Sequence, residues 1–430
     1  MKRYISLYYG SIDFKSGIYL FVSILFALFA SRKVHQRRLN ETLKTHFKRS
    51  VGFYSLTSAR GGIGALLKSL NLGNQNYEVI VSAFTCLAVP TGIISAGFKP
   101  VYVDCGREDI NNPVDAIISK ISVNTKVIIV QHTMGLATDI FRLKERLRDS
   151  DILIIEDCAL SLGTKIDDVI LGSYGDAAII SLELSKFIST GWGGIVVINN
   201  ELLDKKFRLY YNGICPQSRS SSLKWSMQTL LSGISYNPLI YNLIGKYILY
   251  FGYKWQFFRV STSREELKGL VSNRFIEKLG PIQLSFANFQ FKRFNKYSRV
   301  TNSNYNRIKL ELERQGYLVF CSSKEGVYSV TPRISLMVNN PVKAINFFSN
   351  CGIEVGVWFD GPLTPIPDSK MFKYEKSKYP NANFISGHII NFPCHSGVGE
   401  RDLDFIIASI VNFKIQHPES IYVVGKNEKF

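Results

Sequence analysis

The stretch SLELSKFISTGWGG, residues 181–194, decides how the rest of the chain is interpreted. It places one lysine, Lys186, between a serine and a glycine-rich turn. A lysine held in this way can form an imine with an aldehyde cofactor. Upstream, the segment IIEDCALSLGT, residues 154–164, is an apolar strand that ends in the acidic pair Glu156 and Asp157. Together the two segments indicate a pyridoxal phosphate site at the end of a buried strand.

The sequence around these segments alternates short β-branched runs with amphipathic stretches. Strands are expected at residues 77–84, 100–105, 126–133, 152–158, 177–182 and 193–199. Continuous apolar strands are buried on both faces, which predicts a mainly parallel sheet flanked by helices. Helices are expected at residues 61–70 and 140–147. The fold class is therefore α/β.

The pattern changes along the chain and predicts three parts. Residues 39–296 form the large α/β domain, which includes a basic and apolar insertion at residues 205–264. Residues 297–430 are predicted to form a smaller C-terminal α+β domain. Residues 1–38 are an apolar and basic N-terminal segment that lies outside both domains and is a candidate membrane anchor.

Composition sets further limits. The chain has 430 residues, of which 46% are hydrophobic, so it can bury a large core and is not disordered. Its 52 Lys and Arg against 34 Asp and Glu favour a nucleic acid, an anionic lipid or a phosphorylated small substrate. No nucleic-acid-reading motif accompanies the charge, which argues against the first partner. Seven cysteines without a CxxC pair indicate neither disulfides nor a zinc site, and a reducing cytosol is expected.

Two apolar segments suggest contact with the cytoplasmic face of a membrane. Residues 16–31 are an uncharged run that is shorter than the roughly 20 residues needed to span a bilayer. Residues 32–49, which follow, carry seven basic side chains and one acidic one, as expected beside anionic lipid. Residues 237–255 place an apolar helical stripe among Tyr, Trp and Lys. For both segments, a helix buried in the protein or in an oligomer is the alternative.

The cofactor chemistry needs two further groups. A carboxylate must keep the pyridine nitrogen protonated, and Asp157, at the end of a buried strand, is suitable. Glu156 lies on the opposite side of the strand by its period of two. The phosphate needs amides at a helix N-terminus, and the segment LTSARGGIGALLKSL, residues 56–70, offers Ser58 at such a position. A capped surface helix is the ordinary alternative for this segment.

The chain resembles the DegT/StrS family of pyridoxal-phosphate sugar aminotransferases, which have the aspartate aminotransferase fold (fold type I). The motifs that carry the resemblance occur in the family's order over residues 39–410. They are TSARGGIGALLKSL, YEVIVSAFTCLAVPTGIISAGFKPVYVDC, VIIVQHTMGLATDI, IIEDCALSLGT, GSYGDAAIISLELSKFISTGWGGIVV and HIINFPCHSGVGERDLDFI.

The resemblance implies a role for each matched residue. Lys186 would be the imine lysine and proton shuttle, and Asp157 would pair with the pyridine nitrogen. Ser181 and the amides of Ala59 and Arg60, beside Ser58, would hold the phosphate.

Family members are homodimers in which a partner loop reaches the phosphate. Residues 270–284 resemble that loop, with Ser272 or Asn273 as the residue that reaches across.

Three positions depart from the family pattern. Cys86 stands where the family has an aromatic residue stacked on the cofactor ring, and Leu160 stands where it has a glutamine. Ala59 and Arg60 replace the Gly-Thr pair at the phosphate helix. Because Lys186 remains, as does its aspartate, the electron sink is expected to survive.

Three further residues could line the cleft or serve only packing. His132 and His395 lie in the motifs QHTMG and FPCHSG, and Trp192 lies beside the lysine turn. A lone histidine in an α/β core is more often a hydrogen-bonded structural group, whereas both motifs resemble family segments near the cleft.

The resemblance implies an aminotransferase that moves an amino group, from glutamate, to a nucleotide-linked keto-deoxy sugar for surface polysaccharide or lipopolysaccharide synthesis. The positive charge suits a diphosphate-bearing acceptor. A non-catalytic, membrane-associated scaffold or regulator that retains the fold is the alternative, and the departures at Cys86 and Leu160 motivate it.

Overall fold

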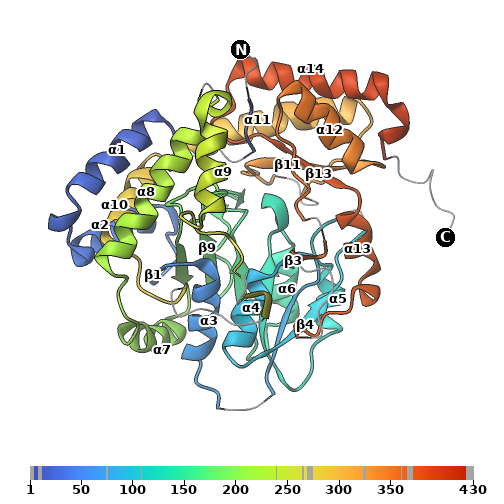
Figure 1. The fold of residues 1–430 in the computed structure, drawn as a ribbon. Helices are drawn as coiled ribbons and strands as arrows, with labels where there is room; N and C mark the ends of the chain where they lie inside the picture. Colours follow the sequence, from blue (N-terminus) through green and yellow to red (C-terminus); the bar gives the residue numbers. More distant parts are fainter. Residues whose placement is uncertain are drawn as a thin grey trace.

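The computed structural model describes residues 4–7, 12–73, 76–107, 109–238, 240–263, 266–268, 275–322, 326–359, 361–365 and 371–422. A seven-stranded sheet runs through the centre in the order β1-β10-β9-β6-β5-β2-β4 (Figure 1). Its strands are β1 (Gly52–Leu56), β2 (Glu78–Ser82), β4 (Lys99–Val103), β5 (Thr125–Gln131), β6 (Leu153–Asp157), β9 (Ala177–Ser181) and β10 (Gly194–Ile198).

The sheet is mainly parallel, as the apolar runs predicted. Only β10 runs antiparallel to its neighbours, β9 on one side and β1 on the other. The other pairs, from β9 through β6, β5 and β2 to β4, are parallel. Six of the seven strands lie where the sequence predicted them. Strand β1, with the sequence GFYSL, was not predicted because it lacks a continuous apolar run.

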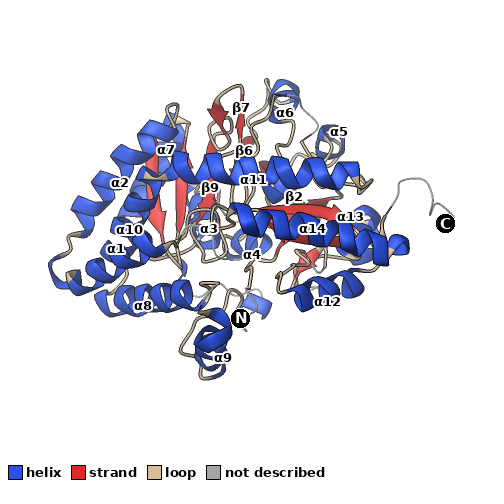
Figure 2. Ribbon diagram, turned by 90° about the horizontal axis from the view of Figure 1, so that it is seen from above, coloured by secondary structure: helices blue, strands red, loops and turns tan. Residues whose placement is uncertain are grey.

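Helices cover both faces of this sheet, and each face has its own core (Figures 1 and 2). Along β10, Val196 and Ile198 enter one core while Ile195 and Val197 enter the other, because successive side chains alternate between faces. The first core also holds side chains of α3 (Ala59–Ser69), α4 (Ala88–Ser95) and α7 (Glu201–Asn212). The second holds side chains of α2 (Arg32–His46), α5 (Val114–Ile118), α6 (Ile140–Arg146) and α10 (Pro281–Lys292).

The C-terminal half forms an α+β unit with a third core. Its antiparallel pair is β11 (Arg333–Met337) with β13 (Ile389–Pro393). The helices around this pair are α11 (Phe294–Arg314), α12 (Pro341–Cys351) and α14 (Glu400–Gln416), whereas α13 (Pro380–Ser386) packs Ala382 and Ile385 into the first core. Helix α11 continues through the domain boundary expected at residue 296/297. Helix α12 shows how sequence sets its ends, since Asn340 caps its first turn and Gly352 ends it at a φ of 87°.

Two short contacts join distant parts of the chain. The amide of Ile5 donates to the carbonyl of Gly352, and Ile5 is buried in the C-terminal core. The N-terminal segment is therefore partly built into the C-terminal unit. In addition, β3 (Thr85–Cys86) pairs with β12 (Leu363–Thr364), which ties the C-terminal unit to the edge of the large domain. A small hairpin joins β7 (Lys165–Ile166) and β8 (Val169–Ile170).

The two apolar segments form helices on the outside of the large domain. Residues 16–31 contribute most of α1 (Phe14–Leu25), which packs beside α8 (Arg219–Ser235) and α10 (Figures 1 and 2). The stripe at residues 237–255 forms a short π-helix (Tyr241–Gly245) and then α9 (Lys246–Lys254), with Leu239 outside the described residues. Within the described part of the chain, no helix is both long and apolar enough to cross a bilayer.

Candidate active site

The carboxyl ends of three parallel strands meet at one edge of the sheet. Gln131, at the end of β5, is opposite Asp157, at the end of β6. Asp157 is opposite Ile179, two residues before Ser181 at the end of β9. In open α/β sheets this edge is where ligands bind, because the strands deliver side chains to it together. The structure thus brings the predicted aspartate and serine to the same place.

Lys186 lies in the turn that follows β9, above this edge. Its Nζ atom is 4.5 Å from the centre of the Trp358 ring, which the C-terminal unit contributes. Burial lowers the pKa of the Lys186 amine, and the Arg333 guanidinium nearby lowers it further, while Asp157 acts in the opposite direction. A lowered pKa increases the neutral fraction of this amine, and the neutral amine is the nucleophilic form.

Asp157 is buried and has spare acceptor capacity. Its Oδ1 accepts a hydrogen bond from the amide of Ala159 at 3.0 Å. Burial raises the pKa of this carboxyl, and the positive charge of Lys186 lowers it. The carboxylate and the amine are therefore electrostatic neighbours in one cleft, as the resemblance implies for a lysine and an aspartate that hold opposite ends of a cofactor ring.

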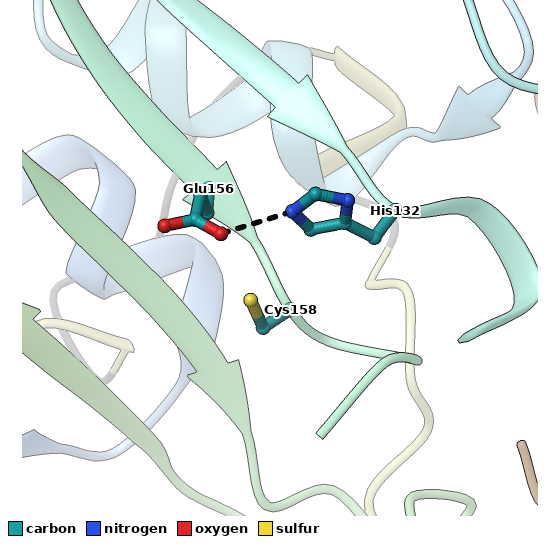
Figure 3. A group of neighbouring side chains, drawn as sticks. All are labelled: His132, Glu156 and Cys158. Atoms are coloured by element: carbon teal, nitrogen blue, oxygen red, sulfur yellow. Dashed lines mark hydrogen bonds and ion pairs between the residues drawn. The ribbon is translucent and has the colours of Figure 1, made fainter. Parts of the chain in front are cut away.

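Glu156 faces the other side of β6, as its position in the strand predicted. Its carboxylate accepts from the amides of Gly172, Tyr174 and Gly175 at 2.6–2.7 Å. It also lies 3.1 Å from Nε2 of His132 (Figure 3). The amide of Thr138 donates to Nδ1 of His132, so Nε2 carries the proton and donates to Glu156. His132 is a structural group here and does not face the cleft.

Cys158 completes a cluster with His132 and Glu156, and the three potential ligand atoms lie within 4.8 Å of one another (Figure 3). Sequence spacing did not suggest this cluster, because His132 is far from the other two in the chain. Burial raises the pKa of the Cys158 thiol, and the charge of Glu156 raises it further, so the thiol stays protonated. Since the histidine and the carboxylate already bond to each other and to backbone amides, the group is a closed hydrogen-bonded cluster.

The N-terminus of α3 provides the predicted anion site. The Ser58 hydroxyl caps the helix by accepting from the amide of Gly61 at 2.9 Å, and it donates to the carbonyl of Phe275. The amides of Ala59 and Arg60 donate to no acceptor within the described part of the chain. Two free amides at a helix start are the arrangement that binds a phosphate.

Strand β10 closely approaches the start of α3. A Cβ atom added at Gly194 would lie 2.4 Å from the amide nitrogen of Ala59, so only glycine permits the approach. Gly194 is paired with Ser181 across β9 and β10. The side chain of Ser181 and the amides of Ala59 and Arg60 therefore share one corner of the cleft, and these residues fit the phosphate end of pyridoxal phosphate.

The Arg60 side chain is directed elsewhere. Its guanidinium forms a buried ion pair with Glu266 and donates to the carbonyl of Ser261 at 2.7 Å. Ser261 lies near the end of the insertion that the sequence placed at residues 205–264, and Glu266 lies two residues beyond it. The amide of Arg60 remains the group that faces the anion site, while its side chain anchors the insertion to α3.

Cys86 and Leu160, the two departures from the family pattern, are both half-buried against the core that also contacts Trp358. Burial raises the pKa of the Cys86 thiol, and the charges of Arg60 and Lys186 lower it. No aromatic ring comes from position 86, but the Trp358 ring stands beside the lysine instead. Sequence reasoning missed this residue because Trp358 is far away in the chain and lies outside the quoted motifs.

Arg333 was missed for the same reason. It lies on β11, is 2% exposed, and its guanidinium carbon is 4.3 Å from the centre of the Trp358 ring. One of its N–H groups donates to the carbonyl of Ser185, next to Lys186. The C-terminal unit therefore delivers a fixed positive charge and an aromatic ring to the wall of the cleft.

A cavity of about 320 Å³ opens beside the lysine turn. The insertion, the lysine turn and the C-terminal unit all line it, with Gln228, Ser232 and Tyr253 from the first, Ser185 from the second and Trp358 from the third. Trp192 also lines it and packs against the Arg259 guanidinium at 4.3 Å, so this tryptophan both lines the cavity and serves packing. Arg259 also stacks on Trp225 and Phe275.

The remaining candidate residues are His395 and the partner-loop pair Ser272 and Asn273. His395 is buried, its Nε2 donates to the carbonyl of Ser6, and its Nδ1 accepts from the amide of Gly397, so it secures the N-terminal segment. Ser272 and Asn273, the two candidates for the loop that reaches the partner, lie outside the described residues.

Comparisons with known proteins agree with this geometry. Residues 30–238 match the DegT/DnrJ/EryC1/StrS aminotransferase family. An uncharacterized protein of Methanocaldococcus jannaschii is 26% identical over 364 residues, which are 83% of this chain and 84% of that protein. The GDP-perosamine synthase of Vibrio cholerae is 32% identical over 168 residues. These residues are 39% of this chain and 46% of that enzyme.

The fold has close counterparts among solved structures. The aminotransferase TlmJ from Streptoalloteichus hindustanus superposes with a TM-score of 0.69, covering 93% of this chain and 96% of that one at 16% identity. This likeness concerns the fold. The family match concerns the chemistry, and the matched residues include Lys186, Asp157 and the start of α3. Over residues 30–238, just under half of its length, the chain matches the DegT/DnrJ/EryC1/StrS aminotransferase family, whose aminotransferases depend on pyridoxal phosphate.

Proposed function

We propose that the protein transfers an amino group from glutamate to a nucleotide-linked keto-deoxy sugar. In balance, the amino acid becomes a 2-oxo acid and the keto sugar becomes an amino sugar. The observation that carries the proposal is the buried Lys186 amine, which has Asp157 as an electrostatic neighbour and lies in the turn that borders a cavity of about 320 Å³. The names of relatives such as GDP-perosamine synthase support a nucleotide sugar as the acceptor.

The chain's own residues have distinct tasks in this reaction. When bound, pyridoxal phosphate supplies the electron sink that makes the carbon beside the transferred nitrogen acidic. Asp157 would hold the positive end of the ring, and the amides of Ala59 and Arg60 would hold the phosphate. The Lys186 Nζ atom would take a proton from the donor carbon and return it, which its lowered pKa favours.

Arg333 supports an amino acid as the donor. Its guanidinium is buried beside Lys186 and Trp358, where a carboxylate would find a fixed positive charge. Glutamate would place its α-carboxylate there. Arg333→Gln should raise the KM for glutamate by about tenfold or more, and leave the KM for the keto sugar within a factor of two. Equal increases in both KM values would contradict this assignment.

The wider setting belongs to the same proposal. The amino sugar would be used for surface polysaccharide or lipopolysaccharide synthesis at the cytoplasmic face of the membrane. The protein would act as a homodimer, in which residues 270–284 of each copy complete the phosphate site of the other.

An absorbance spectrum tests the reaction directly. The purified full chain, loaded with pyridoxal phosphate, should show the visible band of bound cofactor. Glutamate alone should bleach this band and release 2-oxoglutarate, and a nucleotide-linked keto sugar should then restore it. A protein that stays colourless after addition of the cofactor would overturn the proposal and favour a scaffold that has lost catalysis.

A further inference from the structure

Large apolar side chains stand in solvent on two helical segments that lie near each other. On α1 and just after it, Phe14 is 79% exposed and Phe29 is 85% exposed. After α9, Trp255 is 72% exposed. The other exposed members of this outer surface are Ile18, Phe21, Val22, Leu25, Phe26, Leu243, Ile244, Tyr247, Tyr250, Phe251, Phe257 and Val260. Exposed apolar patches that extend over several side chains mark sites of interaction with other molecules.

Packing inside the chain explains only a narrow part of these helices. Helix α1 buries Ser16, Leu20 and Ile24, one stripe that faces α8 and α10. Along α9, Leu249 is the one buried side chain. Tyr19 of α1 stacks on Phe289 and Tyr253 of α9 packs against Phe258, but most of the remaining apolar side chains of both helices are exposed.

A groove connects the two segments. A cavity of about 310 Å³ lies between α1 and α8, and its walls are almost entirely apolar. Phe14, Ile18 and Phe21 line it from α1. Ile234 lines it from α8, and Ile240 lines it from the chain that leads into α9. A groove of this shape accepts a hydrocarbon chain, because it offers little to a polar ligand.

The charges around the surface are mostly positive, with Asp13 as an acidic side chain in the groove wall, where it pairs with Arg293. Residues 14–40 contain five basic and no acidic side chains, and residues 205–264 contain nine basic and no acidic ones. The ammonium groups of Lys246 and Lys254 lie 5.1 and 5.3 Å from the ring centres of Tyr247 and Tyr250. Lysines and aromatic rings side by side on an apolar helix are typical of the bilayer interface.

We propose that α1, its continuation to residue 29, and residues 240–260 form one docking surface for an anionic lipid bilayer, with an acyl chain in the α1–α8 groove. Apolar area would provide the insertion energy, and the basic side chains would select anionic lipid. A second copy of the chain would have to place its own mostly positive surface against this one, which like-charge repulsion disfavours. The inference deepens the membrane localisation of the proposed function and names the surface responsible.

Docking would affect the cleft through shared elements. Gln228 and Ser232 line the catalytic cavity from one side of α8, while Leu230 and Ile234 line the apolar groove from another. Tyr253 of α9 lines the catalytic cavity as well. The wall of the cleft is therefore built on α9, which would rest on the bilayer, and on α8, which lines the acyl-chain groove, so the cleft would open next to the membrane surface.

Vesicle flotation of the full chain tests the proposal. It should bind vesicles of phosphatidylglycerol and phosphatidylcholine, bind phosphatidylcholine alone at least about tenfold less, and weaken in high salt. The double substitution Phe21→Ser with Trp255→Ser should reduce binding by about tenfold or more. The matched control is Leu209→Ser with Ile415→Ser, two apolar residues that are 77% and 73% exposed elsewhere. This control should bind like the unchanged protein.

Two outcomes would overturn the docking surface. One is equal loss of binding in the test and control variants. The other is no vesicle binding by the unchanged protein together with a dimer, seen by sedimentation velocity, that the Phe21→Ser and Trp255→Ser changes dissociate. Cofactor absorbance is measured on every variant. A retained absorbance band with lost flotation separates failure of docking from failure of the catalytic proposal.

Discussion

Two neighbouring residues on β6, Glu156 and Asp157, lie on opposite faces of one sheet, and their surroundings differ in kind. Glu156 accepts three backbone amides and the His132 ring, so its acceptor capacity is used inside the fold (Figure 3). Among the described residues, Asp157 accepts a hydrogen bond from one amide, that of Ala159, and has a lysine as its electrostatic neighbour. The comparison shows that the same carboxylate chemistry serves stability where it is saturated and function where capacity is left for a ligand.

The largest expected effect concerns Lys186, which lies on the open side of the sheet, that is, the face where Asp157 keeps acceptor capacity for a ligand. Lys186→Ala should remove both the visible band of bound cofactor and turnover, with a loss of at least about 10³-fold, because one side chain supplies the covalent attachment and the proton transfer. Exposed Lys120→Ala is the matched control and should retain both. Absorbance and single-turnover rates measure the difference. Turnover that persists without Lys186 would remove the basis for placing the chemistry in this cleft.

Asp157→Asn tests the partner of that lysine. Asparagine keeps the shape and still accepts the amide of Ala159, but it carries no charge to hold a protonated ring nitrogen. We expect turnover to fall by about 10²-fold or more, while the urea midpoint of unfolding changes little. Rates within a factor of three of the unchanged protein would show that Asp157 does not face the ring.

Glu156→Gln tests the closed side of the same strand. An amide cannot accept from all three backbone amides and His132 as the carboxylate does, so buried donors lose their acceptor. We expect a loss of about 2–4 kcal/mol in the free energy of unfolding. Exposed Glu145→Gln should cost almost nothing. Cofactor absorbance per folded molecule should stay unchanged, and its loss without destabilisation would break the contrast between the two faces.

The sequence predicted the open side better than the closed side. Lys186, Asp157, Ser181 and the start of α3 belong to local motifs, and parallel strands necessarily bring their carboxyl ends to one edge. Their meeting in space therefore followed from the order of the strands. The strand period also placed Glu156 away from the cleft, although its hydrogen bonds to residues 172–175 depend on a loop whose path the sequence does not reveal.

Contacts between distant segments were not predictable from the sequence. Trp358 and Arg333 reach the lysine from the C-terminal unit, and no local pattern relates either residue to the lysine turn. For His132 the sequence left two interpretations, a hydrogen-bonded structural group or a contact with substrate, and its hydrogen bonds support the structural one. A side chain at a strand end can turn to either face, and the Glu156 carboxylate holds this ring on the closed one.

The smallest expected effect concerns His395, a structural histidine in the C-terminal unit whose two ring nitrogens are both hydrogen-bonded within the protein. Burial, together with the charge of Arg333, lowers the pKa of His395 to about 4, although its bond to Ser6 opposes the shift. The folded state therefore holds this ring neutral, whereas the unfolded chain protonates it near pH 6.5. Stability from the neutral ring is complete above pH 6.5 and is lost as pH falls toward 4, by up to about 3 kcal/mol.

His395→Gln should flatten this part of the pH profile. The variant keeps an amide that can donate to the carbonyl of Ser6 but has no proton to gain over this range. Urea midpoints at pH 5 and pH 7.5 should therefore differ less in the variant than in the unchanged protein, while cofactor absorbance at pH 7.5 stays the same in both. An identical pH dependence would mean that His395 is protonated in the folded state. Saturated hydrogen bonding would then no longer distinguish the structural groups of this chain from its catalytic ones.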